Sequence, residues 1–278
     1  MIAPTARSRI APMPPVGGLD ADEIDLVLCD ADGTLFDSED AAFAISTIVT
    51  NRLLAELGID GSYTPARLRR WAAGRNFRAT ASALADEAGV LIDPDALEQW
   101  VTVERREVTD ELAVALRPVA AVRDALESLS RRFRLSIVTS SATSRLDACL
   151  IATGLDGLFP VDVRFSAEDS LPTPLAKPDP AIYRCAGQRL GVVAARGLAV
   201  EDSVAGVRSA VAAGFPTVGM LQFVPRDERA DRAAELREAG AGAIVGSWGA
   251  LAGAFATDEP RARSWNEDPD VNEASPAL

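Results

Sequence analysis

Six short runs of apolar and β-branched residues alternate with longer helical patterns along this chain. They span Asp25–Cys29, Arg134–Thr139, Val161–Phe165, Gly197–Val200, Pro216–Met220 and Gly242–Val245. Runs that are apolar almost throughout are typical of parallel strands covered on both faces, and the intervening segments are long enough for crossover helices. The pattern predicts an α/β fold built on a doubly wound parallel sheet.

One interval, residues 38–116, breaks this alternation. It contains only helical patterns, which are separated by glycines and by Pro94. An insertion after the first strand stands over the carboxyl edge of a parallel sheet, where such folds bind ligands. We therefore expect a helical cap at 38–116 and a core domain formed by 22–37 and 117–256. Residues 1–21 and 257–278 have the composition of a flexible leader and tail.

Charge and cysteine content limit the function and the location. The formal net charge of −13 disfavours nonspecific nucleic-acid binding, because no basic face is evident to replace phosphate counterions. No apolar run reaches the ~18 residues of a membrane span. The three cysteines lie in or beside apolar segments, as expected of reduced thiols in a cytoplasmic protein. A small molecule is the expected partner, and both a monomer and a dimer remain open.

Two features of the titratable residues restrict the chemistry further. The chain has no histidine, which excludes a Ser-His-Asp triad and a histidine-ligated metal. Among 28 basic residues Lys177 is the one lysine, so the chain offers a single side-chain ammonium.

Four polar motifs follow four of the expected strands. They are "DADGT" from Asp30, "TSS" from Thr139, Lys177 in "AKPDP", and "EDS" from Glu201. Because parallel strands end at one edge of the sheet, these residues can converge on one crevice. Carboxylates without histidine form an oxygen site that suits Mg²⁺.

This combination of groups has a chemical logic. The Thr139 hydroxyl and the Lys177 ammonium can hold a phosphate, while Asp30 attacks phosphorus and Asp32 serves as acid and base. Each motif alone also has a structural interpretation. "DADG" can form a turn, Ser141 or Thr143 can cap a helix, and the "EDS" segment can be a capped helix start. The order of all four motifs after successive strands favours the functional interpretation.

The four motifs together resemble those of the haloacid dehalogenase (HAD) superfamily. The quoted residues are "DADGT", the threonine ending "LSIVT", "KPDP" and "EDSVAGVRSA", and the resemblance extends from Ile24 to Ala256. It is closest to the phosphatase and β-phosphoglucomutase-like branch with an α-helical cap. The resemblance implies a Rossmann-like HAD core in which Asp30 becomes the aspartyl-phosphate and Asp32 protonates the leaving group and then activates water.

The same resemblance implies ligand-binding roles. The phosphoryl oxygens would be bound by Thr139, Ser140 and Lys177. Mg²⁺ would be coordinated by Asp30, Asp202 and the backbone carbonyl of Asp32, with Glu201 or Ser203 reaching it through water.

Departures from other HAD branches favour a phosphatase. Dehalogenases lack the second aspartate of the first motif, here Asp32, and phosphonoacetaldehyde hydrolases need a cap lysine that this chain does not have. β-Phosphoglucomutases carry a histidine where this chain has Ala42 or its neighbours. We expect a hydrolase of a small phosphorylated metabolite, a sugar phosphate or a phosphoglycolate-like acid. The alternatives are a phosphosugar mutase and a non-catalytic binding protein on the same scaffold.

The cap is where substrate choice is expected. Arg75, Asn76 and Arg78 follow an expected helix break at Gly74 and can touch the leaving group of a substrate. Arginines on exposed helix faces are the alternative interpretation of this segment.

Overall fold

The computed structural model describes residues 21–72 and 76–256, so residues 1–20 of the expected leader and the whole expected tail, together with Gly74 and Arg75, lie outside the described residues. Ala21, the last residue of the expected leader, begins a short 3₁₀ helix that extends to Glu23. All six expected strands are present. They are β1 (Leu26–Cys29), β2 (Arg134–Thr139), β3 (Arg164–Ser166), β4 (Gly197–Glu201), β5 (Thr217–Met220) and β6 (Ala243–Val245). The third begins later than expected, because Val161–Val163 forms a 3₁₀ turn in which Val161 is exposed.

The six strands form one parallel sheet in the order β3-β2-β1-β4-β5-β6. All four residues of β1 are completely buried, as expected of a central strand covered on both faces. The chain moves outward in opposite directions from β1 and from β4, so these neighbours flank the point where the strand order reverses. Ligands bind at the carboxyl edge of such a switch point.

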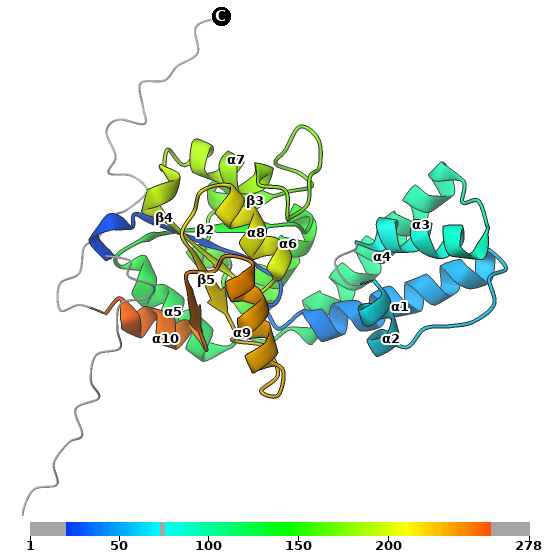
Figure 1. Cartoon of the computed structure of the whole chain (residues 1–278), viewed down its shortest axis with the longest axis horizontal. Helices are drawn as coiled ribbons and strands as arrows, with labels where there is room; N and C mark the ends of the chain where they lie inside the picture. The colour runs from blue at the N-terminus through cyan, green and yellow to red at the C-terminus, as the bar shows by residue number, and fades with distance from the viewer. Residues whose placement is uncertain (1–20, 73–75, 257–278) are drawn as a thin grey trace, which may run out of the picture.

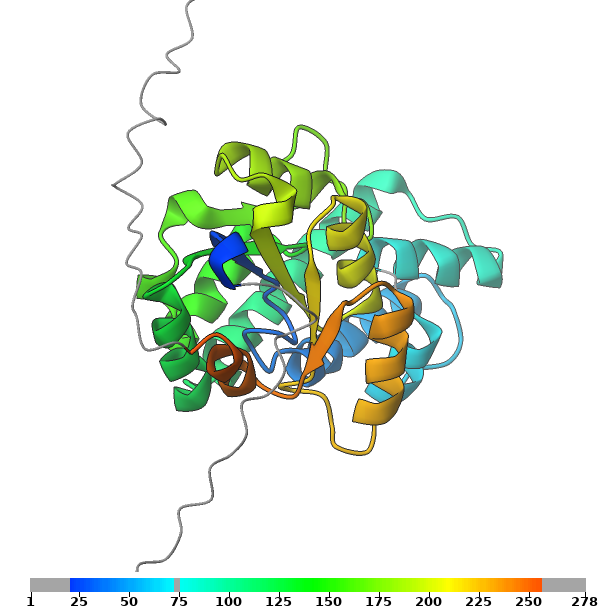
Figure 2. The ribbon, with the colours of Figure 1, turned by 60° about the vertical axis from the view of Figure 1, so that its left-hand side comes forward.

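Six helices cover the two faces of this sheet (Figures 1 and 2). They are α5 (Ala120–Ser130), α6 (Thr143–Thr153), α7 (Ala181–Arg189), α8 (Val204–Ala212), α9 (Arg229–Glu238) and α10 (Trp248–Ala254). Helix α8 packs between α7 and α9 on one face, and α5 packs against α10 on the other. The doubly wound parallel α/β fold is therefore confirmed.

Four further helices lie between β1 and α5 in the chain. They are α1 (Glu39–Glu56), α2 (Pro65–Trp71), α3 (Phe77–Ala88) and α4 (Pro94–Ala115). Thr64, Asn76 and Asp93 cap the last three with side-chain oxygens, and the second and fourth start with proline at the first helical position. Figure 1 shows these helices to one side of the sheet, joined to it at one end of α1 and α4.

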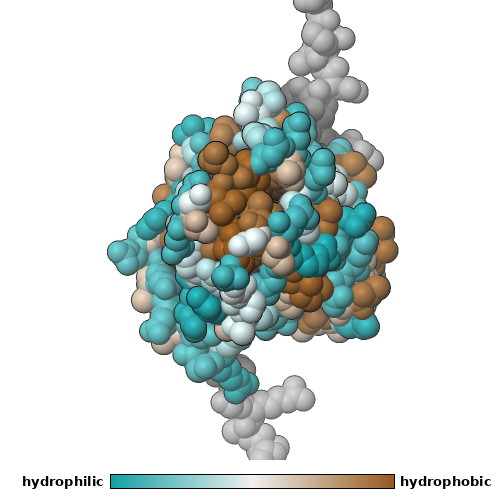
Figure 3. All heavy atoms as spheres, turned by 90° about the vertical axis from the view of Figure 1, so that its right-hand side faces the viewer, coloured by the Kyte–Doolittle hydropathy of each residue, from teal (hydrophilic) through white to brown (hydrophobic). Residues whose placement is uncertain are grey.

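This helical segment has a small apolar cluster of its own, which contains Leu54, Leu68, Ala72 and Leu84. The face of the molecule on that side shows an apolar area within a polar surround (Figure 3). Within the described ranges, no helix combines the length and apolar character needed to cross a membrane. Cys29, Cys149 and Cys185 are free thiols, as the sequence predicts.

Candidate active site

The loop after β1 presents Asp30 and Asp32 at the carboxyl edge of the sheet. The Ala31 carbonyl accepts hydrogen bonds from the backbone N–H groups of Leu35 at 2.8 Å and Phe36 at 3.1 Å. Gly33 supplies a positive φ of 78°, which a residue with a side chain adopts only under strain. This compact turn holds both carboxylates at the edge.

Register brings the acidic motif of β4 next to Asp30. Cys29 is aligned with Val200, and the Asp30 N–H donates to the Val200 carbonyl at 3.0 Å, so Asp30 and Glu201 leave adjacent strands together. Carboxylate oxygens of Asp30, Glu201 and Asp202 all lie within 4.8 Å of one another, and all three residues are buried. The predicted meeting of these two motifs is confirmed.

Lys177 lies in the middle of this acidic group. Its ammonium donates at 2.6 Å to Asp30 Oδ1, at 2.6 Å to Glu201 Oε1 and at 2.7 Å to the Val138 carbonyl. Burial works against the charged ammonium, but the two carboxylates outweigh it and raise the pKa of Lys177 above its ordinary value. The one lysine of the chain therefore stays charged and offsets part of the negative charge.

The carboxylates still exceed the cationic charge available to them. Burial and the neighbouring Asp30 raise the pKa of Glu201 to about 7, although Lys177 and the Tyr183 hydroxyl, which donates to Glu201 at 2.6 Å, act in the opposite direction. Burial and the same carboxylates raise the pKa of Asp202 well above its usual value. An uncompensated anionic group of this kind is stabilised by a cation.

The residues present fit a divalent cation. Glu201 Oε2 is buried without a hydrogen-bond partner, one of two such side-chain atoms in the part of the chain that the structure describes. A group of hard oxygen donors with an unsatisfied member suits Mg²⁺. The Asp32 side chain does not belong to this group, and the predicted metal role of its backbone carbonyl stays a prediction.

Asp32 is held by a different set of side chains. Its Oδ1 accepts from Ser38 Oγ at 2.6 Å and from Arg145 Nη2 at 2.9 Å, and its Oδ2 accepts from Ser141 Oγ at 2.7 Å. Burial raises the pKa of Asp32, but Arg145 and the two hydroxyls outweigh burial and lower it below the ordinary value. The carboxylate is therefore ionised in this arrangement.

Thr139 is the last residue of β2, and Ser140 follows it. The Thr139 hydroxyl oxygen accepts from the Ser141 N–H at 3.0 Å, and Ser140 Oγ accepts from the Lys177 N–H at 3.2 Å. The bond between Ser140 and Lys177 joins the second and third motifs. The binding of phosphoryl oxygens by Thr139 and Ser140 stays a prediction.

The capping interpretation is wrong for one serine and holds for another. Ala142 occupies the N-cap of α6 without a side-chain hydrogen bond. Ser141 bonds Asp32 instead, and Thr143 lies inside the helix, where its N–H donates to Asp169. Ser203 does cap α8, since its Oγ accepts from the Gly206 N–H at 3.0 Å.

A cavity of about 300 Å³ lies between the helical segment and the core. Asp32, Ser140 and Arg145 line it from the core, and Asn76 and Arg78 line it from the helical segment. Glu98 pairs with the exposed Arg78, and Asn76 caps α3. Asn76 and Arg78, the two described members of the predicted specificity segment, therefore both line this cavity. Their contact with a substrate stays a prediction.

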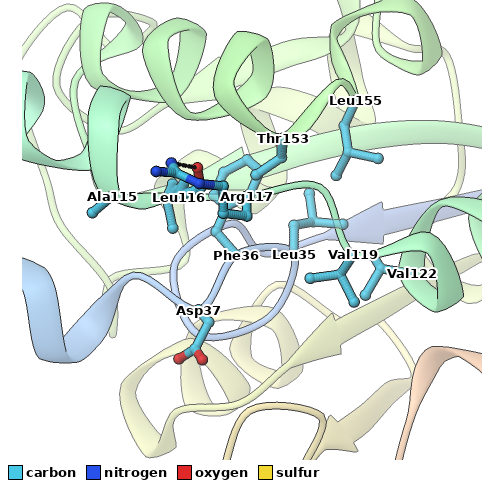
Figure 4. A pocket seen from close by; sticks show the side chains of 10 residues that line it. All are labelled: Leu35, Phe36, Asp37, Ala115, Leu116, Arg117, Val119, Val122, Thr153 and Leu155. Atoms are coloured by element: carbon cyan, nitrogen blue, oxygen red, sulfur yellow. Dashed lines mark hydrogen bonds between the residues drawn. The ribbon is translucent and has the colours of Figure 1, made fainter.

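Another cavity, of about 220 Å³, lies where the chain passes between the core and the helical segment (Figure 4). Leu35, Leu116 and Leu155 contribute to its mainly apolar lining, and Asp37 points away from them. None of the predicted site residues lines it, whereas Asp32 and Ser140 line the larger cavity.

Sequence reasoning did not find four residues that complete the site. Ser38, Thr34, Arg145 and Tyr183 each bond one of the acidic side chains. Only Arg145 carries a signal in the sequence, because a basic residue in the first turn of a helix is unfavourable beside the helix dipole.

Comparison with known proteins identifies the relatives of this chain. A family model described as haloacid dehalogenase-like hydrolase matches residues 24–214. Protein CbbY of Cupriavidus necator is 33% identical over 202 residues, which are 69% of this chain and 76% of that protein. Phosphoglycolate phosphatase of Nitrosococcus oceani is 26% identical over 196 residues, 70% of this chain and 82% of that protein.

A solved structure of a HAD family hydrolase from Deinococcus radiodurans R1 was determined with bound phosphate and sodium. It has a TM-score of 0.60 and 26% identity, and the match covers 84% of this chain and 98% of that one.

Proposed function

This chain belongs to the haloacid dehalogenase-like hydrolases, and we propose that it is a Mg²⁺-dependent phosphatase of a small phosphorylated metabolite. The observation that carries the proposal is the buried group formed by Asp30, Glu201, Asp202 and Lys177, which combines an oxygen site for a cation with a charged ammonium. The phosphatase name of one relative and the phosphate in a solved neighbour support the same substrate class.

The mechanism assigns a separate task to each aspartate. Asp32, which is ionised in the free protein, takes up a proton when the anionic substrate binds. A carboxylate oxygen of Asp30 then attacks phosphorus, and the bond from phosphorus to the ester oxygen breaks as Asp32 gives that proton to the ester oxygen. The products of this step are the free alcohol and an aspartyl-phosphate. Asp32, now ionised, takes a proton from water, whose oxygen attacks phosphorus and releases Asp30 and inorganic phosphate.

The other residues of the site bind charge. The hydroxyl groups of Thr139 and Ser140 bind phosphoryl oxygens at the end of β2. Lys177, whose three N–H donors bond Asp30, Glu201 and the Val138 carbonyl, attracts the phosphoryl group by its charge and exchanges one of these bonds to hold a phosphoryl oxygen.

Mg²⁺ would be held by Asp30, Asp202 and the Asp32 carbonyl, with Glu201 or Ser203 reaching it through water. It would supply positive charge that offsets the negative charge of the phosphoryl oxygens. Tyr183 and Thr34 orient Glu201 and Asp202 through their hydroxyl groups.

The direct test is metal-dependent hydrolysis of p-nitrophenyl phosphate and of phosphorylated metabolites, measured as released phosphate with Mg²⁺ and with EDTA. We expect turnover only with the cation and none in Asp30→Asn, which keeps the shape of the side chain but not its nucleophilic charge. Turnover that persists in that variant would contradict the mechanism. Interconversion of phosphate isomers without phosphate release would identify a mutase instead.

Location and assembly are also part of the proposal. Three free thiols support a reducing compartment, and we place the protein in the cytoplasm. Cell fractionation with an antibody against the chain tests this. Sedimentation of the purified protein distinguishes a monomer from a dimer.

A further inference from the structure

The Asp32 carboxylate is nearly saturated with hydrogen bonds. Two ionised carboxylate oxygens offer about four lone-pair sites. Ser38 and Arg145 occupy both sites of Oδ1, and Ser141 occupies one site of Oδ2. One lone pair of Oδ2 is left free, and it can carry the proton that passes to the ester oxygen.

Two of these three donors come from one short segment, Ser141 to Arg145, at the start of α6. Arg145 is the third residue of that helix. A positive charge there faces the positive end of the helix dipole, which makes the position unfavourable for arginine. Its side chain is only 22% exposed, and its Nε is buried without a hydrogen-bond partner. Placing a guanidinium here costs stability that one buried ion pair seldom returns.

The contacts of Arg145 indicate that it acts on Asp32. Asp32 is the one ion-pair partner that the described residues give it. Other titratable groups facing the pair are Glu104 from α4, Glu39 from α1 and Cys149 from α6. Arg145 and Asp32 also line the same cavity between the helical segment and the core.

Resting on the proposed function, we infer that Arg145 is a positioning residue, which together with Ser141 aims Oδ2 of Asp32 at the ester oxygen in the cavity. Arg145 itself exchanges no proton. It fixes the rotamer of the carboxyl group that does, so that the proton carried on the free lone pair of Asp32 Oδ2 faces the leaving group.

The experiment compares the wild type with Arg145→Gln and Arg145→Lys on two kinds of substrate. An alkyl phosphate needs a proton on its leaving oxygen, whereas p-nitrophenyl phosphate has a leaving group that departs as the anion. We expect Arg145→Gln to lower kcat on the alkyl ester by about 10- to 100-fold, because misplaced acid catalysis forfeits much of its rate contribution. The loss on the aryl ester should be much smaller, and Arg145→Lys should recover part of the activity.

A double-mutant cycle separates positioning from a structural role. In the Asp32→Asn background, measured on the alkyl ester in long incubations, Arg145→Gln should cause no further loss. Arg123→Gln, on the exposed face of α5 and paired with Glu127, is the matched control and should leave both substrates unaffected. Thermal unfolding shows whether each variant is folded, and Arg145→Lys replaces Arg145→Gln if the latter is not.

Equal losses on both substrates, or losses that add in the cycle, would overturn the inference and leave the proposed function intact. A wild-type protein without metal-dependent turnover would overturn the proposed function and this inference together.

Discussion

Gly33 and Asp202, on the loops after β1 and β4, are packed so closely that a Cβ atom on Gly33 would overlap the Asp202 carboxylate. Gly33 also has a φ of 78°, so two independent constraints exclude a side chain there. The turn that presents Asp30 and Asp32 is thereby fitted against a carboxylate from another strand.

Gly33→Ala is therefore expected to weaken cation binding as well as folding. The backbone strain costs about 1–2 kcal/mol, and the methyl group pushes the Asp202 carboxylate out of its position. Isothermal titration with Mg²⁺ measures the affinity. Gly58→Ala is the matched control, because Gly58 has a φ of 69° with nothing within 4 Å of its Cβ position. It should lose similar stability but keep its Mg²⁺ affinity, and equal affinity in both variants would contradict the account.

Thr34→Val removes the hydroxyl that donates to Asp202 Oδ1 at 2.9 Å and keeps the shape of the buried side chain. Loss of a partner that orients a metal ligand typically costs about 10- to 100-fold in metal affinity, and we expect a loss in that range with kcat little changed at saturating Mg²⁺. Thr217→Val is the control, since the Thr217 hydroxyl bonds the Phe215 carbonyl at the opposite edge of the sheet. A similar loss in both variants would argue against an orienting role for Thr34.

Stability without the cation should fall as pH rises. The pKa of Glu201 is raised from 4.5 to about 7, so the folded protein binds more protons than the unfolded chain across that window. The raised pKa of Asp202 acts in the same direction. The lowered pKa of Asp32 makes stability rise with pH instead, but only at pH values below its ordinary pKa of 3.8.

The measurement is thermal unfolding in EDTA and in Mg²⁺ at about pH 5.5, inside this window, and at about pH 8, above it. The stabilisation by Mg²⁺ should be larger at the higher pH, where Glu201 is ionised. A larger effect at the lower pH would contradict the charge assignment of the acidic group.

In the absence of a bound cation, Lys177→Met should strongly lower the free energy of unfolding. It leaves Asp30 and Glu201 buried without their shared ammonium, and removing one partner of a buried pair costs about 3–5 kcal/mol. Chemical denaturation in EDTA checks the loss. Arg123→Met, which breaks an exposed pair on α5, should show no comparable change. Added Mg²⁺ should return part of the stability of the Lys177 variant, although its activity should stay low.

The sequence by itself was sufficient to predict the strands of the parallel sheet and the polar motifs at their carboxyl edge. Apolar runs bounded by polar residues identify parallel strands because a strand that is buried on both faces needs apolar residues at nearly every position, and this composition can be read locally. Four motifs at strand ends then predict that Asp30, Lys177 and Asp202 meet, since parallel strands share one carboxyl edge.

The tertiary structure alone decided what surrounds each carboxylate. A serine hydroxyl before a helix can cap that helix or bond a distant side chain, and Ser141 does the second because packing brings Asp32 to it. Arg145 lies 113 residues from Asp32 in the chain, and no local pattern names its partner. Such contacts depend on how helices pack and which way side chains point, so they are set only when the whole chain is folded.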